Sequence, residues 1–108
     1  MEQLDPQSPR FECIRSTDFQ GDPLLELHGE LDMSSATEFR QSIEELISAG
    51  VTRVVFDLKD LVFMDSSGIA VLVFAANSIS SVEVRNSSSI IKRIVEATGL
   101  TGFLRLDP

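Results

Sequence analysis

The segment from Val54 to Val73 constrains the fold more than any other, because it combines three different local patterns. Residues 54–58 (VVFDL) are rich in β-branched and aromatic side chains, which predicts a buried strand. After a short connection come the sequence DSSG at residues 65–68 and an almost wholly apolar stretch, which is typical of a buried helix. The segment therefore predicts a strand, a loop and a helix, in that order.

The loop in this segment holds residues that favour the start of a helix. Side-chain oxygens of Asp65, Ser66 and Ser67 can accept hydrogen bonds from the unpaired N–H groups of a first turn. A phosphate there would add about −1.5 to −2 charge units at the end of the helix that favours negative charge, so the fold should tolerate it. A partner matched to the neutral hydroxyl would lose complementarity. Spacing alone leaves two interpretations open: a helix cap, which it favours, or phosphorylation of Ser66 or Ser67.

Before this segment, the pattern predicts a hairpin and a helix. Residues 11–16 and 24–29 have strand character and are separated by a turn at residues 18–23. The sequence SATE at residues 35–38 has the spacing of a capping box. Gly50 stands where a glycine commonly ends a helix. The apolar stripe of this helix is Ala36, Phe39, Ile43, Leu46 and Ile47.

After this segment, strand and helix patterns continue to alternate. The central helix is predicted over residues 67–78, and residues 82–85 predict an edge-type strand. A third helix follows the serines at 87–89 and ends at Gly99. Residues 103–106 predict either a short last strand or an apolar tail packed against the body of the domain. The apolar stripe of this third helix is Ile90, Ile91, Ile94 and Val95. The fold class is therefore α/β, with a mixed sheet that is largely parallel after the hairpin.

Composition narrows the class of protein. The 108 residues, 43% hydrophobic and 24% charged, predict one globular domain at residues 11–108 after a flexible tail at residues 1–10. The formal net charge of −8 argues against nucleic acid and anionic membrane as partners. A single cysteine, Cys13, excludes an internal disulfide framework. Because no signal-peptide or membrane-spanning pattern is found, we expect a cytoplasmic protein.

The chain lacks the patterns expected of a catalytic or metal site. A serine hydrolase acting through Ser66 would need a base, and the only imidazole is His28, inside a predicted strand. The DSSG sequence lacks the first glycine of a nucleophile elbow, and neither a phosphate-binding loop nor metal-ligand spacing is found. We therefore predict no catalytic residues, no metal and no cofactor.

Several motifs, taken in order, resemble those of the STAS domain of bacterial anti-sigma factor antagonists. They are GELD at residues 29–32, VVFDL at 54–58, FMDSSG at 63–68, SIIKRI at 89–94 and TGL at 98–100. The resemblance covers nearly the whole chain. It implies a single STAS-like domain with a mixed four- to five-stranded sheet, an N-terminal β-hairpin and helices packed mainly on one face.

The resemblance implies a regulatory binding protein. In this family an anti-sigma factor with serine kinase activity phosphorylates the first serine of the motif, which is Ser66 here. The unphosphorylated antagonist binds that anti-sigma factor and releases a sigma factor, and a PP2C-type serine phosphatase reverses the modification. We expect a monomer or a weak homodimer.

The resemblance also implies a partner-binding surface made of two loops and one helix face. From the loops come Asp32, Met33, Ser34, Asp65, Ser66, Ser67 and Gly68. In these loops Asp65 is expected to orient the second loop and Ser67 to cap the helix or bind the partner. From the helix, Ile69, Leu72 and Val73 are candidates for an exposed docking face, although a buried helix would have the same sequence.

Two departures from the family pattern bear on which partner this chain binds. Between Gly68 and the next strand the chain is about one helical turn shorter than is usual in the family, and it ends where relatives usually add a helix. The same fold could instead serve as a STAS scaffold, or as a ligand- or nucleotide-sensing module of a stress-signalling complex.

Overall fold

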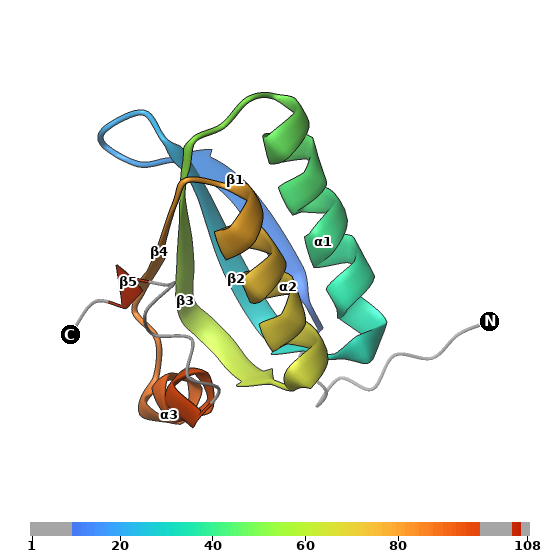
Figure 1. Ribbon diagram of the computed structural model, residues 1–108. Helices are drawn as coiled ribbons and strands as arrows, with labels where there is room; N and C mark the ends of the chain where they lie inside the picture. Colours follow the sequence, from blue (N-terminus) through green and yellow to red (C-terminus); the bar gives the residue numbers. More distant parts are fainter. Residues whose placement is uncertain (1–9, 98–104, 107–108) are drawn as a thin grey trace.

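The computed structural model describes residues 10–97 and 105–106, which form five strands and three helices (Figure 1). The strands are β1 (Glu12–Thr17), β2 (Pro23–Leu31), β3 (Arg53–Met64), β4 (Ser81–Arg85) and β5 (Arg105–Leu106). The helices are α1 (Met33–Ser48), α2 (Ser66–Ser78) and α3 (Ser89–Ala97). Three predicted features lie wholly or partly outside the described residues. They are residues 1–9 of the predicted tail, the helix end at Gly99, and residues 103–104 of the predicted last strand.

The strands form one mixed sheet in the order β1-β2-β3-β4-β5. β1 pairs antiparallel with β2, and each later neighbouring pair is parallel, which confirms the predicted hairpin followed by a parallel sheet. Each later strand is added at the same edge of the sheet. Because strand–helix–strand connections are right-handed, the connecting helices then lie on the same face of the sheet. Figure 1 shows α1 and α2 side by side against one face of the sheet, while α3 contacts β3.

Strand β3 is longer than predicted, with 12 residues that continue beyond Leu58 to Met64. The buried residues in this extension are Leu58, Leu61 and Met64, three positions apart instead of the two expected of a regular strand. Register shifts in the pairing with β2 account for this interval, because each bulge changes which side chains face the core. The polar pair Lys59 and Asp60 made this bulged strand resemble a connection.

Strand β4 is not at the edge of the sheet, contrary to the prediction. It lies between β3 and β5. Its alternating sequence arises because Val82 and Val84 are buried, whereas Glu83 and Arg85 are partly exposed on the opposite face. That alternation therefore reflects a sheet with one polar face.

The hydrophobic core lies between the sheet and its helices. Phe39 of α1 stands at its centre, with its ring 6.3 Å from that of Phe11 and 5.4 Å from that of Phe56 on β3, both measured between centroids. The predicted stripe of α1 supplies three fully buried residues, and α3 buries Ile91 and Val95 while its predicted stripe residue Ile90 is exposed. These contacts fix α1 on the sheet.

Gly29 permits the backbone just before β1 to approach β2 closely. Its φ is +87°, and a Cβ added there would lie 2.2 Å from the backbone oxygen of Arg10. A residue with a side chain would therefore be strained by its backbone conformation and would also clash with backbone atoms.

We predict that Gly29→Ala lowers the free energy of unfolding by about 2 kcal/mol or more, because strain and clash combine. Gly21 has the same φ of +87° but nothing within 4 Å of an added Cβ. Gly21→Ala is therefore the matched control, with an expected loss of about 1 kcal/mol from strain alone. Urea unfolding of the two variants measures the difference, and equal losses would contradict the close approach.

Candidate functional site

The helices α1 and α2 both begin at the carboxyl ends of neighbouring parallel strands. Leu31 and Met64, the last residues of β2 and β3, are directly paired, and the backbone N–H of Asp65 donates to the oxygen of Leu31 over 3.1 Å. The two loops that lead into the helices are thereby joined. In an α/β sheet this edge, where chain segments leave adjacent strands, is the usual position of a binding site.

Gly68 brings the first turn of α2 down onto this pair of strands. A Cβ at this position would lie 2.7 Å from Cγ of Leu31 and 2.7 Å from Cγ of Met64. The side chain of alanine would therefore push the start of α2 away from the sheet. Gly68, which was predicted to contact a partner, is buried and has a packing role.

Asp65 is the N-cap of α2. Its Oδ1 accepts hydrogen bonds from the backbone N–H groups of Ser67, at 2.8 Å, and Gly68, at 3.3 Å. Ser67 is half-buried, and the capping predicted for it is performed by Asp65. Ser66 is the first residue of the helix and is exposed, and within the described part of the chain the structure gives its hydroxyl no hydrogen bond.

The start of α1 is held by a capping box centred on Asp32, three residues before the predicted one. The Asp32 carboxylate accepts from the backbone N–H of Ser34 at 2.9 Å, and the Ser35 hydroxyl oxygen accepts from the backbone N–H of Asp32 at 3.0 Å. Ser35 also donates to the backbone oxygen of Glu30 at 2.9 Å, so this buried hydroxyl is fully used. The prediction that Ser35 is the N-cap is wrong because an aspartate already occupies the preceding turn.

Hydrogen bonds make the Asp32 carboxylate more acidic than usual. The Ser34 hydroxyl, which donates to Oδ1 of Asp32 at 2.7 Å, is the largest cause of a lowered pKa, and the backbone N–H groups of Ser34 and Ser35 add to it. Asp32 and Asp65 thus place carboxylates at the two helix starts.

Three large apolar side chains are exposed next to these helix starts. Met33, the first residue of α1, is 79% exposed, and Val62 and Phe63 at the end of β3 are 57% and 44% exposed. Sequence reasoning found Met33 through the resemblance but missed Val62 and Phe63. The signal for them was the apolar run at residues 61–64. Leu61 and Met64 are buried, and the bulged register leaves Val62 and Phe63 exposed between them. We call Met33, Val62 and Phe63 the apolar rim.

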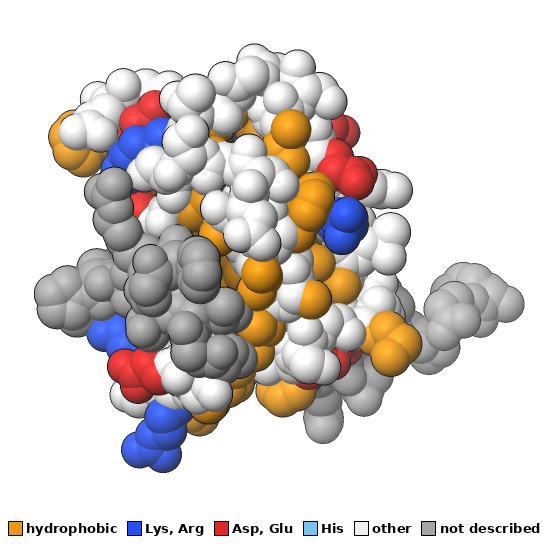
Figure 2. Space-filling model, viewed as in Figure 1, with side chains coloured by type: hydrophobic (Ala, Val, Ile, Leu, Met, Phe, Trp, Pro, Cys, Tyr) orange, Lys and Arg blue, Asp and Glu red, His pale blue; other side chains and the backbone are white. Residues whose placement is uncertain are grey.

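Only part of the predicted docking face of α2 is exposed. Leu72 is 1% exposed and belongs to the core, so the expectation that it faces a partner is wrong. Ile69 and Val73 are partly exposed, and hydrophobic side chains are visible along this side of the molecule in Figure 2. Helix α2 is apolar on several sides because it packs against both the sheet and α1.

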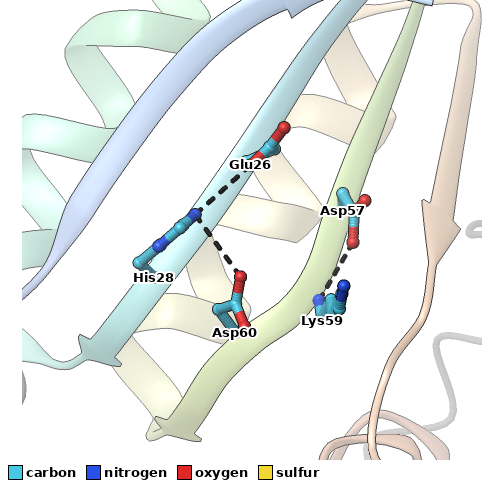
Figure 3. A pocket seen from close by; sticks show the side chains of 5 residues that line it. All are labelled: Glu26, His28, Asp57, Lys59 and Asp60. Carbon is cyan, nitrogen blue, oxygen red and sulfur yellow. Dashed lines mark hydrogen bonds and ion pairs between the residues drawn. The ribbon is translucent and has the colours of Figure 1, made fainter.

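A second cluster of charged groups lies on the other face of the sheet, away from α1 and α2 (Figure 3). A hollow of about 130 Å³ is lined there by Glu26, His28, Asp57, Lys59 and Asp60. The Nε2 atom of His28 is 3.4 Å from the Glu26 carboxylate and 3.7 Å from that of Asp60. His28 is a strand residue, as predicted. The described residues include no group of His, Cys, Asp and Glu arranged to hold a metal ion.

Comparison with known proteins identifies the family of this chain. The STAS domain profile matches residues 14–108. The chain belongs to the STAS domain family. A curated relative from Mycobacterium tuberculosis, the anti-sigma-F factor antagonist RsfB, is 29% identical over 102 residues, which cover 92% of this chain and 84% of that protein.

Solved structures show the STAS fold. The crystal structure of an anti-sigma factor antagonist from Mycobacterium paratuberculosis has a TM-score of 0.79 at 23% identity, covering 98% of this chain and 91% of that one. The Bacillus cell fate determinant SpoIIAA, in its phosphorylated form, has a TM-score of 0.70 at 22% identity, covering 90% and 92%. These similarities confirm a single α/β domain of the STAS type. In the described part of the chain, none of the helices is long and apolar enough to cross a membrane.

We predict that the stabilising effect of Asp32 disappears in acid. Because its folded-state pKa is lowered, its carboxylate contributes stability that is present above the ordinary aspartate value of 3.8 and is lost as the pH falls through the folded value. The difference in unfolding free energy between the native protein and Asp32→Ala should therefore be constant near neutral pH and shrink below that value. Urea unfolding across this range measures it, and a difference that does not change with pH would contradict the assignment.

Proposed function

We propose that this STAS domain is an anti-sigma factor antagonist controlled by phosphorylation of Ser66. In its unphosphorylated form it binds, in the cytoplasm, an anti-sigma factor with serine kinase activity and thereby releases a sigma factor. Phosphorylation of Ser66 stops this binding, and a PP2C-type serine phosphatase restores it. The family, the name of the M. tuberculosis relative and the solved phosphorylated form of SpoIIAA support this role.

The observation that carries the proposal is the state of the Ser66 hydroxyl. It is exposed at the first position of α2, while the neighbouring Asp65 supplies the helix cap. A kinase can therefore modify Ser66 without breaking a hydrogen bond that the described fold uses. The positive end of the helix dipole stabilises an added anion by roughly 0.3–1 kcal/mol, so the folded state accepts the phosphate.

The surroundings of Ser66 explain how a phosphate would block binding. The apolar rim offers surface that a partner can desolvate, and Asp32 and Asp65 lie at the two helix starts beside it. A partner that covers this surface must match two carboxylates with basic groups or N–H donors. A doubly charged phosphate brought into the same contact costs several kcal/mol unless it is paired.

The arrangement keeps the one imidazole of the sequence away from Ser66. His28, the only imidazole in the sequence, lies on the sheet face opposite α2 and contacts Glu26 and Asp60. A serine nucleophile requires a base within hydrogen-bond reach. We therefore propose that Ser66 receives a phosphoryl group from another protein and that this chain performs no catalysis itself.

The test of this switch is the affinity for the cognate anti-sigma factor. Ser66→Ala should bind like the unmodified protein and should not be phosphorylated by the kinase with ATP, whereas Ser67→Ala should still be phosphorylated. Ser66→Asp should bind at least about tenfold more weakly with a nearly unchanged melting temperature.

The matched control for the aspartate is Ser80→Asp, which adds the same charge at an exposed position beyond the other end of α2. Its affinity should stay within about twofold of the native value, because an exposed distant charge is screened by salt. If Ser80→Asp weakened binding as much as Ser66→Asp, net charge and not the site would determine affinity. Phosphorylation of Ser66→Ala would overturn the assignment of the residue.

Truncation of the apolar rim should weaken binding and leave the fold intact. We expect Met33→Ala and Phe63→Ala each to reduce affinity by about tenfold, the loss typical of a central apolar anchor. Both side chains are exposed and neither belongs to the buried core, so their effect on stability should be smaller than that of a core residue. Phe19→Ala, at an exposed position in the β1–β2 turn, is the control and should bind normally.

Leu72→Ala should do the reverse of the rim variants, because the side chain is buried. We expect it to lower the free energy of unfolding by about 2–5 kcal/mol. The affinity of the fraction that remains folded should be close to native. Titration calorimetry and thermal unfolding separate the two quantities, and a stable Leu72→Ala protein that fails to bind would contradict this assignment.

A further inference from the structure

Strand β1 has a free edge. It is the first strand in the sheet order and pairs only with β2 among the described strands. The backbone groups on its outer side are a template for another strand, and proteins often cover or charge such edges to prevent pairing. In this chain Ile14, at the middle of β1, is 44% exposed.

A hollow of about 400 Å³ runs along this free edge. Its lining comprises residues 10–14 together with Glu38 of α1. Successive side chains of a strand point to opposite faces. A hollow lined by an unbroken run of residues along β1 must therefore follow the edge of the sheet. Glu38 of α1 forms its wall on the helix side.

The two faces of β1 carry different groups. Ile14 is paired with Glu26 and lies on the open face of the sheet, whereas Cys13 and Arg15 are paired with Leu27 and Leu25, whose side chains face the core. Arg15 therefore points to the helix side. Within the described residues the structure gives no ion pair to either the Arg15 guanidinium or the Glu38 carboxylate.

We infer that this edge pairs antiparallel with β1 of a second copy, with Ile14 directly opposite Ile14 of that copy. The two exposed isoleucines then pack against each other at the two-fold axis. Arg15 of each copy lies opposite Cys13 of the other, on the helix side, where the hollow holds the unpaired Glu38. Two symmetric Arg15–Glu38 ion pairs complete the contact.

Neighbouring registers that keep the same faces together are poorer. A shift in one direction places Arg15 opposite Arg15 of the second copy, and like charges directly opposite each other are destabilising. A shift in the other direction places Ile14 opposite Glu12. A slip by one residue mixes the two faces. The net charge of −8 on each copy adds repulsion, so the dimer should be weak and its formation should depend on concentration.

Disulfide trapping tests the register. In a Cys13→Ser background, Ile14→Cys places two thiols at the two-fold axis, within the Cα separation that a disulfide can span. Ser16→Cys is the matched control, because it lies on the same face of β1 but is displaced by roughly 13 Å from its copy in this register. Under mild oxidation Ile14→Cys should form covalent dimers at least about tenfold faster than Ser16→Cys. Equal rates, or faster trapping of Ser16→Cys, would overturn the register.

Charge exchange tests the ion pairs. Sedimentation velocity of the native protein over a concentration series should show a reversible dimer. Arg15→Glu and Glu38→Arg should each raise its Kd by at least about fivefold, and the double variant should return to within about twofold of the native Kd. A protein that is monomeric at every concentration, or a double variant no better than the singles, would overturn the proposal. Circular dichroism checks that each variant is folded.

Discussion

The contact of Gly68 with Leu31 and Met64 determines the geometry of the site. Because position 68 lacks a Cβ, the first turn of α2 lies directly on the paired ends of β2 and β3. The hydrogen bond from Asp65 to the oxygen of Leu31 joins the same two segments. The starts of α1 and α2 are therefore held at one edge of the sheet, and the apolar rim and Ser66 take their positions from them.

Each helix start is already capped by a carboxylate, so the stability of the fold does not depend on the serine that we propose is phosphorylated. Asp32 and Asp65 accept the hydrogen bonds of the first-turn N–H groups, so the fold does not depend on the exposed Ser66 hydroxyl. A phosphate on Ser66 adds charge without removing a cap. Its main effect should therefore be on the affinity for a partner that covers this surface, and the domain should stay folded. A phosphorylation switch requires both.

The order of elements and the position of Ser66 could be predicted because they depend on local patterns and on motifs. Three features could not. The extension of β3 to Met64 depends on bulges in its pairing with β2, which bring Val62 and Phe63 to the surface. The burial of Leu72 depends on which side of α2 packs into the core, and the sequence of α2, which is apolar on several sides, does not reveal that side. The choice of Asp32 over Ser35 as N-cap depends on where β2 ends.

The most direct test of the central claim is the phosphorylation state of the protein isolated from its own cells. Intact-mass analysis should show a fraction with a single phosphate, and peptide mapping should assign it to Ser66. The fraction should change with growth conditions as kinase and phosphatase compete. A phosphate assigned to Ser67 or to another residue, or its absence under all growth conditions, would contradict the account and leave Ser66 as an ordinary first residue of α2.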